Sequence, residues 1–140
     1  MKDQKDYQIE TKAVQSGYTP SNGQPRILPI YQSTTYKYDS SDYLGELFDL
    51  KVDGHMYSRI SNPTVSAVEE RISDMEGGVG ALCTSSGQAA TFISVFNITS
   101  CGQNIIASTT IYGGSTNLLA FTMKRMGIEV RFATPDMTDE

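Results

Sequence analysis

The chain has 140 residues, of which 39% are hydrophobic and 19% are charged, and this composition indicates a globular domain or part of one. Its net charge of -5 includes no Lys/Arg cluster, so nothing in the charge pattern favours nucleic acid or an anionic membrane as partner. No apolar run is long enough to span a bilayer, and the charged start lacks a signal-peptide core, so we expect a cytoplasmic protein.

Residues 1–61 are rich in polar side chains and tyrosine and show little helical periodicity. Prolines interrupt the first half of this stretch. Residues 42–50 are predicted to form a short helix, with Leu44, Leu47 and Phe48 as its apolar face. A segment this long with so little regular pattern is predicted to be an arm that lies on the rest of the molecule or on a second subunit.

From Asn62 onward the pattern becomes regular. Asn62 and Pro63 are typical of the N-cap and the first position of a helix, and Gly77-Gly78 predicts its end. Residues 81–84 are predicted to form a short buried strand. Residues 88–98 are apolar nearly all round, which predicts a buried helix.

The second half of the chain continues with further regular elements. Residues 104–108 are predicted to form a strand, residues 115–126 a helix that ends at Gly127, and residues 128–132 another strand. Alternating strands and helices indicate an α/β fold, a parallel sheet with two right-handed crossovers. Three strands with nearly bare faces make a poor domain, so we expect the chain to end within its fold.

Two turns at strand ends are candidate ligand sites. Ser85-Ser86-Gly87-Gln88 precedes a predicted helix, where backbone N–H groups attract a phosphate. Because the run has neither dinucleotide nor P-loop spacing, an ordinary strand–helix turn is the simpler interpretation of it alone. Tyr112-Gly113-Gly114 follows a strand at the edge where α/β sheets bind ligands, and Tyr112 either stacks on a flat heteroaromatic ring or covers the sheet end.

A third candidate is Tyr57-Ser58-Arg59, just before the capped helix. Arg59 is suited to hold a phosphate through two N–H groups, with the Tyr57 hydroxyl as a further donor. The alternative interpretation is an ordinary surface arginine, which the same residues would also fit. His55 has no evident partner and is interpreted as a polar arm residue.

The cysteines do not predict a metal site. Cys83 and Cys101 form neither a C-x-x-C pair nor metal-ligand spacing with His55, the only histidine. We therefore expect free thiols and no bound metal.

Five segments, in order along the chain, resemble motifs of the pyridoxal 5'-phosphate (PLP)-dependent Cys/Met-metabolism enzymes of fold type I. The segments are Pro29–Tyr36 (PIYQSTTY), Tyr57–Thr64 (YSRISNPT), Met75–Gly78 (MEGG), Ser85–Ala90 (SSGQAA) and Tyr112–Gly114 (YGG). The family includes cystathionine γ-synthase, cystathionine β- and γ-lyases, methionine γ-lyase and O-acetylhomoserine sulfhydrylase. The order of the five segments and their coverage of most of the chain make the resemblance specific.

The resemblance implies an architecture and an assembly. Residues 1–61 would be an N-terminal arm that contacts a neighbouring subunit. Residues 62–140 would be the first, truncated part of the PLP-binding large domain, which is aspartate aminotransferase-like. The parent enzyme would self-associate as a dimer or homotetramer.

The same resemblance implies roles for particular residues. Gly87 and Gln88 would donate backbone N–H groups to the cofactor phosphate. The ring of Tyr112 would stack on the pyridine ring. Tyr57 and Arg59 would reach the phosphate of the cofactor in the neighbouring subunit.

Within the family, the resemblance is strongest to the O-acetylhomoserine sulfhydrylases. Gly45–Lys51, running into Gly54–Tyr57, carries this subgroup assignment, and methionine γ-lyases commonly have cysteine at the position of Gly114. The implied reaction is a γ-replacement in transsulfuration and methionine biosynthesis, in which this transferase makes homocysteine or methionine from O-acetylhomoserine and sulfide or a thiol. Cystathionine γ-synthase, which also has glycine at that position, and a cystathionine or methionine γ-lyase remain alternatives.

A PLP enzyme needs a lysine that binds the cofactor covalently and an acid beside its pyridine nitrogen. None of the lysines of this chain follows a strand in a Ser-x-Thr-Lys context; they are Lys2, Lys5, Lys12, Lys37, Lys51 and Lys124. We therefore expect the chain alone to be inactive. A hypothesis of another class is a non-catalytic fragment that serves in assembly, through exposed apolar surface and an open strand edge.

Overall fold

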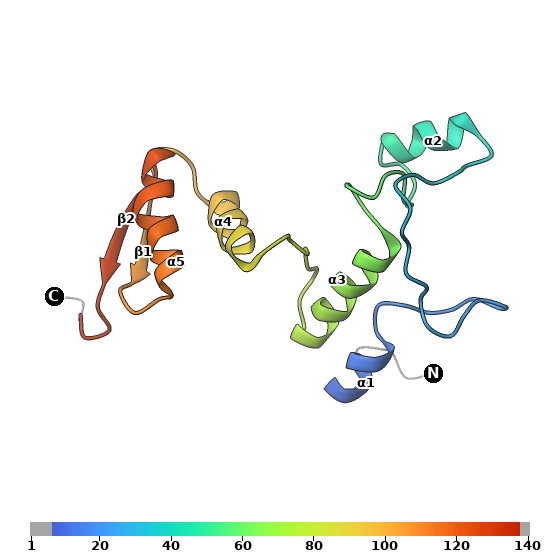
Figure 1. The fold of residues 1–140 in the computed structure, drawn as a ribbon, viewed down its shortest axis with the longest axis horizontal. Helices are drawn as coiled ribbons and strands as arrows, with labels where there is room; N and C mark the ends of the chain where they lie inside the picture. The colour runs from blue at the N-terminus through green and yellow to red at the C-terminus, as the bar shows by residue number, and fades with distance from the viewer. Residues whose placement is uncertain (1–6, 138–140) are drawn as a thin grey trace. The chain divides into compact units, whose positions relative to one another are not determined.

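The computed structural model describes residues 7–137. The chain forms two compact units, one up to Cys83 and one from Thr84 onward. The first unit carries helices α1 to α3, and the second carries helices α4 and α5, the π-helical segment η2 and strands β1 and β2 (Figure 1). Within residues 7–137, every helix is too short or too polar to cross a membrane.

Helix α3 (Pro63–Glu76) has both of the ends that the sequence predicts. The side chain of Asn62 accepts a hydrogen bond from the N–H of Thr64 at 2.9 Å, and Pro63 occupies the first position, where a missing N–H costs nothing. Gly77 closes the helix in the left-handed region at φ 67°, a conformation that favours glycine.

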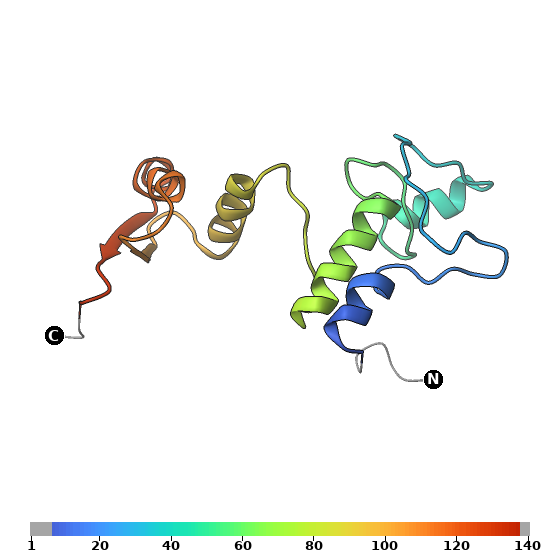
Figure 2. The same cartoon turned by 60° about the horizontal axis from the view of Figure 1, so that its bottom comes forward.

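Helix α1 (Ile9–Gln15) lies beside α3, as Figures 1 and 2 both show, and it was not predicted from the sequence. Gln8 provides no side-chain cap and no residue of α1 is buried, so the usual local signals are absent. Contacts with α3 hold it instead. The Lys12 ammonium donates to the carbonyl of Asp74 at 3.1 Å, and Arg71 Nε donates to the carbonyl of Ser16 at 2.8 Å.

Helix α2 (Ser41–Phe48) confirms the short helix predicted in the arm. Ser40 caps it, because its hydroxyl accepts from the N–H groups of Asp42 and Tyr43 at 3.2 and 3.3 Å. Leu47 is fully buried, as the predicted apolar face requires. Phe48 of the same face is 65% exposed.

Strands β1 (Asn104–Ser108) and β2 (Glu129–Ala133) pair in parallel, with Asn104 opposite Glu129 and Ser108 opposite Ala133. Helix α5 (Gly113–Asn117) and segment η2 (Leu118–Met123) connect them and cover the pair in Figure 1. This strand–helix–strand unit confirms the predicted parallel α/β class.

The core of the second unit lies between η2 and the strands. Leu119, Met123 and Ile128 are its buried members, and Met123 has no exposed surface. A plain α-helix was predicted over residues 115–126, but η2 is π-helical. Since hydrogen bonds of a π-helix join residues five apart, Leu118 and Met123 come to the same side and both are buried.

Two other predictions for this part of the chain are wrong. No strand forms at residues 81–84, where Leu82 is 70% exposed, and the described residues contain one parallel strand pair rather than two crossovers. A strand forms only where a neighbouring strand pairs with its backbone N–H and C=O groups, and the local sequence does not show whether that neighbour is present. Helix α4 (Gly87–Ile98) forms, but none of its residues is buried, because no further layer covers its apolar side chains within residues 7–137.

Candidate functional site

The turn before α4 presents free backbone donors. Ser86 is the N-cap in extended conformation, and its hydroxyl accepts from the N–H of Ala89 at 3.1 Å. Within the described residues, the N–H groups of Gly87 and Gln88 have no hydrogen-bond acceptor. Nothing lies within 4 Å of the point where a Cβ of Gly87 would be. Two free N–H groups at the positive end of a 12-residue helix, with open space beside them, fit the phosphate of PLP.

The tyrosine predicted to stack on the cofactor lies near the same turn within the second unit. Tyr112 follows β1, immediately precedes α5 and is 78% exposed. The side-chain amide of Gln88 donates to the carbonyl of Gly114 at 2.8 Å, which ties the α4 turn to the α5 turn. A Cβ on Gly114 would lie 2.5 Å from Cε1 of Tyr112, so the ring rests against a glycine. The structure therefore brings Gly87, Gln88 and Tyr112 together.

The other two predicted residues, Tyr57 and Arg59, lie in the first unit. The guanidinium carbon of Arg59 is 5.3 Å from the centre of the Tyr57 ring. Within residues 7–137, neither the Tyr57 hydroxyl nor the Arg59 guanidinium has a hydrogen bond or an ion pair. Both polar groups are free to bind an anion, and the ring contact keeps them adjacent.

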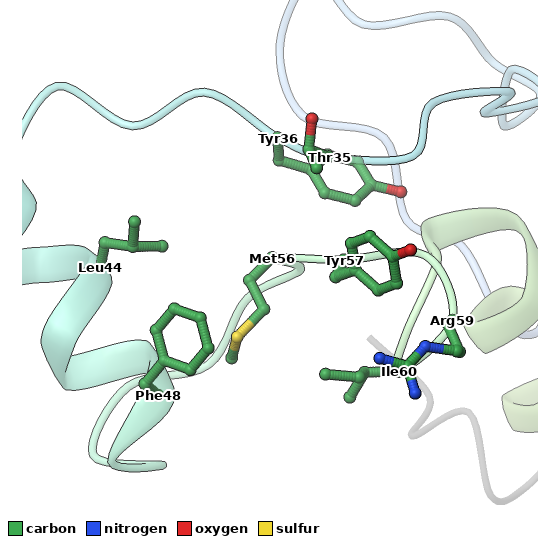
Figure 3. Close-up of a pocket in the computed structure, with 8 residues that line it drawn as sticks. All are labelled: Thr35, Tyr36, Leu44, Phe48, Met56, Tyr57, Arg59 and Ile60. Atoms are coloured by element: carbon green, nitrogen blue, oxygen red, sulfur yellow. The ribbon is translucent and has the colours of Figure 1, made fainter.

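A pocket of about 370 Å³ lies next to this pair, and it was not predicted from the sequence (Figure 3). Leu44 and Phe48 of α2 face Met56, Tyr57 and Ile60 across it. The helical periodicity of residues 42–50 predicts the apolar face of α2. What the periodicity does not reveal is that this face meets the segment carrying Tyr57.

The interpretation of His55 as a residue without a partner is wrong. Its Nδ1 lies 3.0 Å from the hydroxyl of Ser61, and its ring centre lies 5.9 Å from that of Tyr36. The contact with Ser61 closes the loop that carries Tyr57 and Arg59, so His55 is a structural member of this loop.

The lysines that the structure describes are engaged elsewhere or lie on helices. Lys37 pairs with Asp39 at 3.2 Å and Lys51 with Asp49 at 2.7 Å, while Lys124 directly follows η2. Lys2 and Lys5 lie outside the described residues. Residues 7–137 contain no group of three His, Cys, Asp or Glu side chains able to hold a metal ion, and both cysteines are exposed and unpaired.

Known proteins resemble more than nine-tenths of the chain. O-acetyl-L-homoserine sulfhydrylase 1 of Thermus thermophilus is 41% identical over 133 residues, which are 94% of this chain and 32% of that protein. A crystal structure from Campylobacter jejuni, described as an O-acetylhomoserine (thiol)-lyase with a pyridoxyl-lysine phosphate, has a TM-score of 0.87 and 36% identity, over 94% of this chain and 32% of its own. A cystathionine γ-lyase structure from Micromonospora echinospora has a TM-score of 0.76 and 30% identity, over 91% of this chain and 31% of its own.

The chain spans about a third of the length of the curated relatives it matches. Residues 10–140 match the family model of the Cys/Met metabolism PLP-dependent enzymes, which is nearly the whole sequence. The free donors at the α4 turn suit the cofactor of that family. The chain belongs to the Cys/Met metabolism PLP-dependent enzyme family.

Proposed function

We propose that this chain is part of an O-acetylhomoserine sulfhydrylase, which replaces the acetate of O-acetylhomoserine by sulfide or a thiol. The Cγ–O bond breaks and a Cγ–S bond forms, and acetate leaves together with the proton that H₂S or the thiol gives up. The products would be homocysteine or methionine. The observation that carries this proposal is the 41% identity to a protein named O-acetyl-L-homoserine sulfhydrylase 1, over 94% of the chain.

The cofactor of such an enzyme supplies an electron sink for negative charge generated on the amino-acid substrate. In the proposal, the N–H groups of Gly87 and Gln88 bind its phosphate. The ring of Tyr112 stacks on its pyridine ring and thereby orients it. The free donors at α4 and the exposed ring of Tyr112 support these roles.

The proposal assigns Tyr57 and Arg59 to a neighbouring subunit's cofactor. Residues 1–61 would act as an arm on that subunit, and residues 62–140 as part of the PLP-binding domain of a self-associating cytoplasmic enzyme. The free Tyr57 hydroxyl and the free Arg59 guanidinium, whose carbon lies 5.3 Å from the centre of the Tyr57 ring, support binding of a phosphate from outside the first unit.

Arg59→Ala tests this assignment in the enzyme made from the whole reading frame that encodes the chain. We expect weaker PLP retention after gel filtration, because one bidentate phosphate contact is lost. Arg26→Ala is the matched control, since it removes the same charge from an exposed position outside the pocket. Equal retention in both variants would refute the role of Arg59.

The reaction type is tested by comparing γ-replacement with γ-elimination in the same enzyme. A sulfhydrylase should form homocysteine from O-acetylhomoserine and sulfide faster than it releases ammonia and 2-oxobutyrate without sulfide. Faster elimination would instead favour a lyase, the alternative to which the similarity with the cystathionine γ-lyase structure points. A preference for cysteine over sulfide as the sulfur nucleophile would favour cystathionine γ-synthase.

We further propose that the 140-residue chain alone does not catalyse the reaction. Lys37 and Lys51 are paired with aspartates in the arm, and Lys124 lies in a helical stretch, whereas the cofactor lysine is expected at a strand end. Borohydride reduction in the presence of PLP should therefore give no single labelled lysine. One specifically labelled lysine together with turnover would contradict this proposal.

A second candidate function is assembly without catalysis. It is favoured by the apolar helix α4, which has no buried residue, and by Ile106 of β1, which is 73% exposed. Concentration-dependent association in sedimentation experiments would support it. A stable monomer with a cooperative melt would count against it.

A further inference from the structure

Asn62 does more than cap helix α3. The cap uses only one of the two polar atoms of its side chain, Oδ1, which accepts a hydrogen bond from the N–H of Thr64 at 2.9 Å. Serine or aspartate would provide that cap equally well. The amide is nearly buried, with 7% of the residue exposed. Its Nδ2 faces three acceptors, the carbonyl of Tyr31 at 3.0 Å, the hydroxyl of Ser58 at 3.1 Å and the hydroxyl of Tyr36 at 3.2 Å. A buried donor group with this many partners has a task that capping does not explain.

The partners of this amide fix the centre of the loop that carries Tyr57 and Arg59. Ser58 is held through its side chain by Asn62, by the Tyr36 hydroxyl at 3.0 Å and by the carbonyl of Ser33. Its own N–H donates to the carbonyl of Thr34 at 2.9 Å. The loop is therefore attached to residues 31–36 through both the main chain and the side chain of one residue.

Ser58 stands between the two residues proposed to bind phosphate. The carbonyl of Tyr57 accepts from the N–H groups of Ile60 and Ser61 at 2.9 and 3.0 Å, which makes the turn tight. In Figure 3, Tyr57 and Arg59 lie side by side at one end of the pocket. Apart from the contact between ring and guanidinium, their neighbouring position depends on Ser58 staying in place, because no hydrogen bond holds either side chain within residues 7–137.

We propose that Asn62 is a positioning residue for the anion-binding pair Tyr57 and Arg59, an inference that rests on the phosphate role proposed above. The buried Nδ2 group holds Ser58 against residues 31–36. Without it, the loop would spend part of its time in other conformations, and phosphate binding would include the cost of ordering it.

The test uses Asn62→Ser in the full chain. Serine keeps a good helix cap and stays neutral, but its side chain is too short to reach Ser58, Tyr31 and Tyr36 together. We expect exchange of the Ser58 amide hydrogen to become at least about tenfold faster than in the unsubstituted chain, as for the loss of about one buried hydrogen bond. The affinity for inorganic phosphate, followed by NMR at the Arg59 side chain, should fall by a similar factor.

Ser40→Ala is the matched control, because it removes the cap of α2 and leaves the loop untouched. It should change neither the Ser58 exchange rate nor the phosphate affinity. Tyr36→Phe removes one acceptor of the amide and should give an intermediate effect. In the enzyme made from the whole reading frame, Asn62→Ser should weaken PLP binding while kcat at saturating PLP stays the same.

The possible failures are distinguishable. If Asn62→Ser behaves like Ser40→Ala in both measurements, or if the Ser58 amide of the unsubstituted chain is unprotected, the positioning role is wrong. If Arg59→Ala does not change phosphate binding, the proposed function of Arg59 is wrong. The exchange rate at Ser58 then still decides whether Asn62 holds the loop.

Discussion

Gly17 should be the glycine of the first unit that is least tolerant of substitution. It lies in the left-handed region at φ 84°, and a Cβ there would overlap the carbonyl oxygen of Ala67 in α3 and lie 2.9 Å from its carbon. Gly17→Ala would require a left-handed alanine, at about 1–2 kcal/mol, and displacement of α3 backbone, at about 1–3 kcal/mol. We expect the free energy of unfolding to fall by about 2–5 kcal/mol.

Denaturant melts followed by near-UV circular dichroism of tyrosine measure this loss, because every tyrosine except Tyr112 belongs to the first unit. Gly23→Ala is the control, since Gly23 has φ 79° but nothing within 4 Å of its Cβ position. It should lose only about 1–2 kcal/mol. A loss for Gly17→Ala no larger than that for Gly23→Ala would refute the close approach of Gly17 to α3.

Three further outcomes are expected in the second unit. Gly114→Ala should displace the Tyr112 ring, because the new methyl group would lie 2.5 Å from Cε1, and the tyrosine NMR shifts of the variant report it. Met123→Ala should lower the free energy of unfolding by about 2–5 kcal/mol in a denaturant melt, since Met123 has no exposed surface. The hydrogen bond and then the charge of Arg131 hold the pKa of Glu129 below its ordinary value, so Arg131→Gln should raise that pKa in an NMR titration. The pair stabilises the fold while Glu129 is ionised, and this contribution disappears as the pH falls through its lowered pKa.

Local sequence signals predicted the elements that carry their own ends. Asn62, Pro63 and Gly77 delimit α3, and Ser86 and Thr99 bound α4 near the predicted positions. The missed and mistaken elements depend on partners far along the chain. Helix α1 is held by bonds from Lys12 and Arg71 across 62 and 55 residues, and a strand at 81–84 would need a neighbour. Periodicity reports only what lies within a few turns of a residue.

The candidate residues show the same difference between features set by local sequence and features set by distant contacts. The free N–H groups at Gly87 and Gln88 follow from a glycine after a capping serine, and the sequence alone indicates them. The hydrogen bond from Gln88 to Gly114 joins residues 26 positions apart, and the bonds from Asn62 to Tyr31 and Tyr36 span 31 and 26 positions. No spacing rule predicts these contacts, because they depend on how the loops fold back on the helices.

In each unit, the candidate residues lie on a loop that a side-chain amide holds in place. An amide can donate and accept at once, so Asn62 caps a helix and holds Ser58 with the same group. Within residues 7–137, Gln88 similarly has a free backbone N–H, while its side-chain amide donates to the carbonyl of Gly114 at 2.8 Å. A loop fixed beforehand needs less ordering when an anion binds, which raises affinity without another contact to the ligand. Within the segment Tyr57–Thr64, the side-chain amide of Asn62 donates to Ser58, which lies between the two residues proposed to touch phosphate.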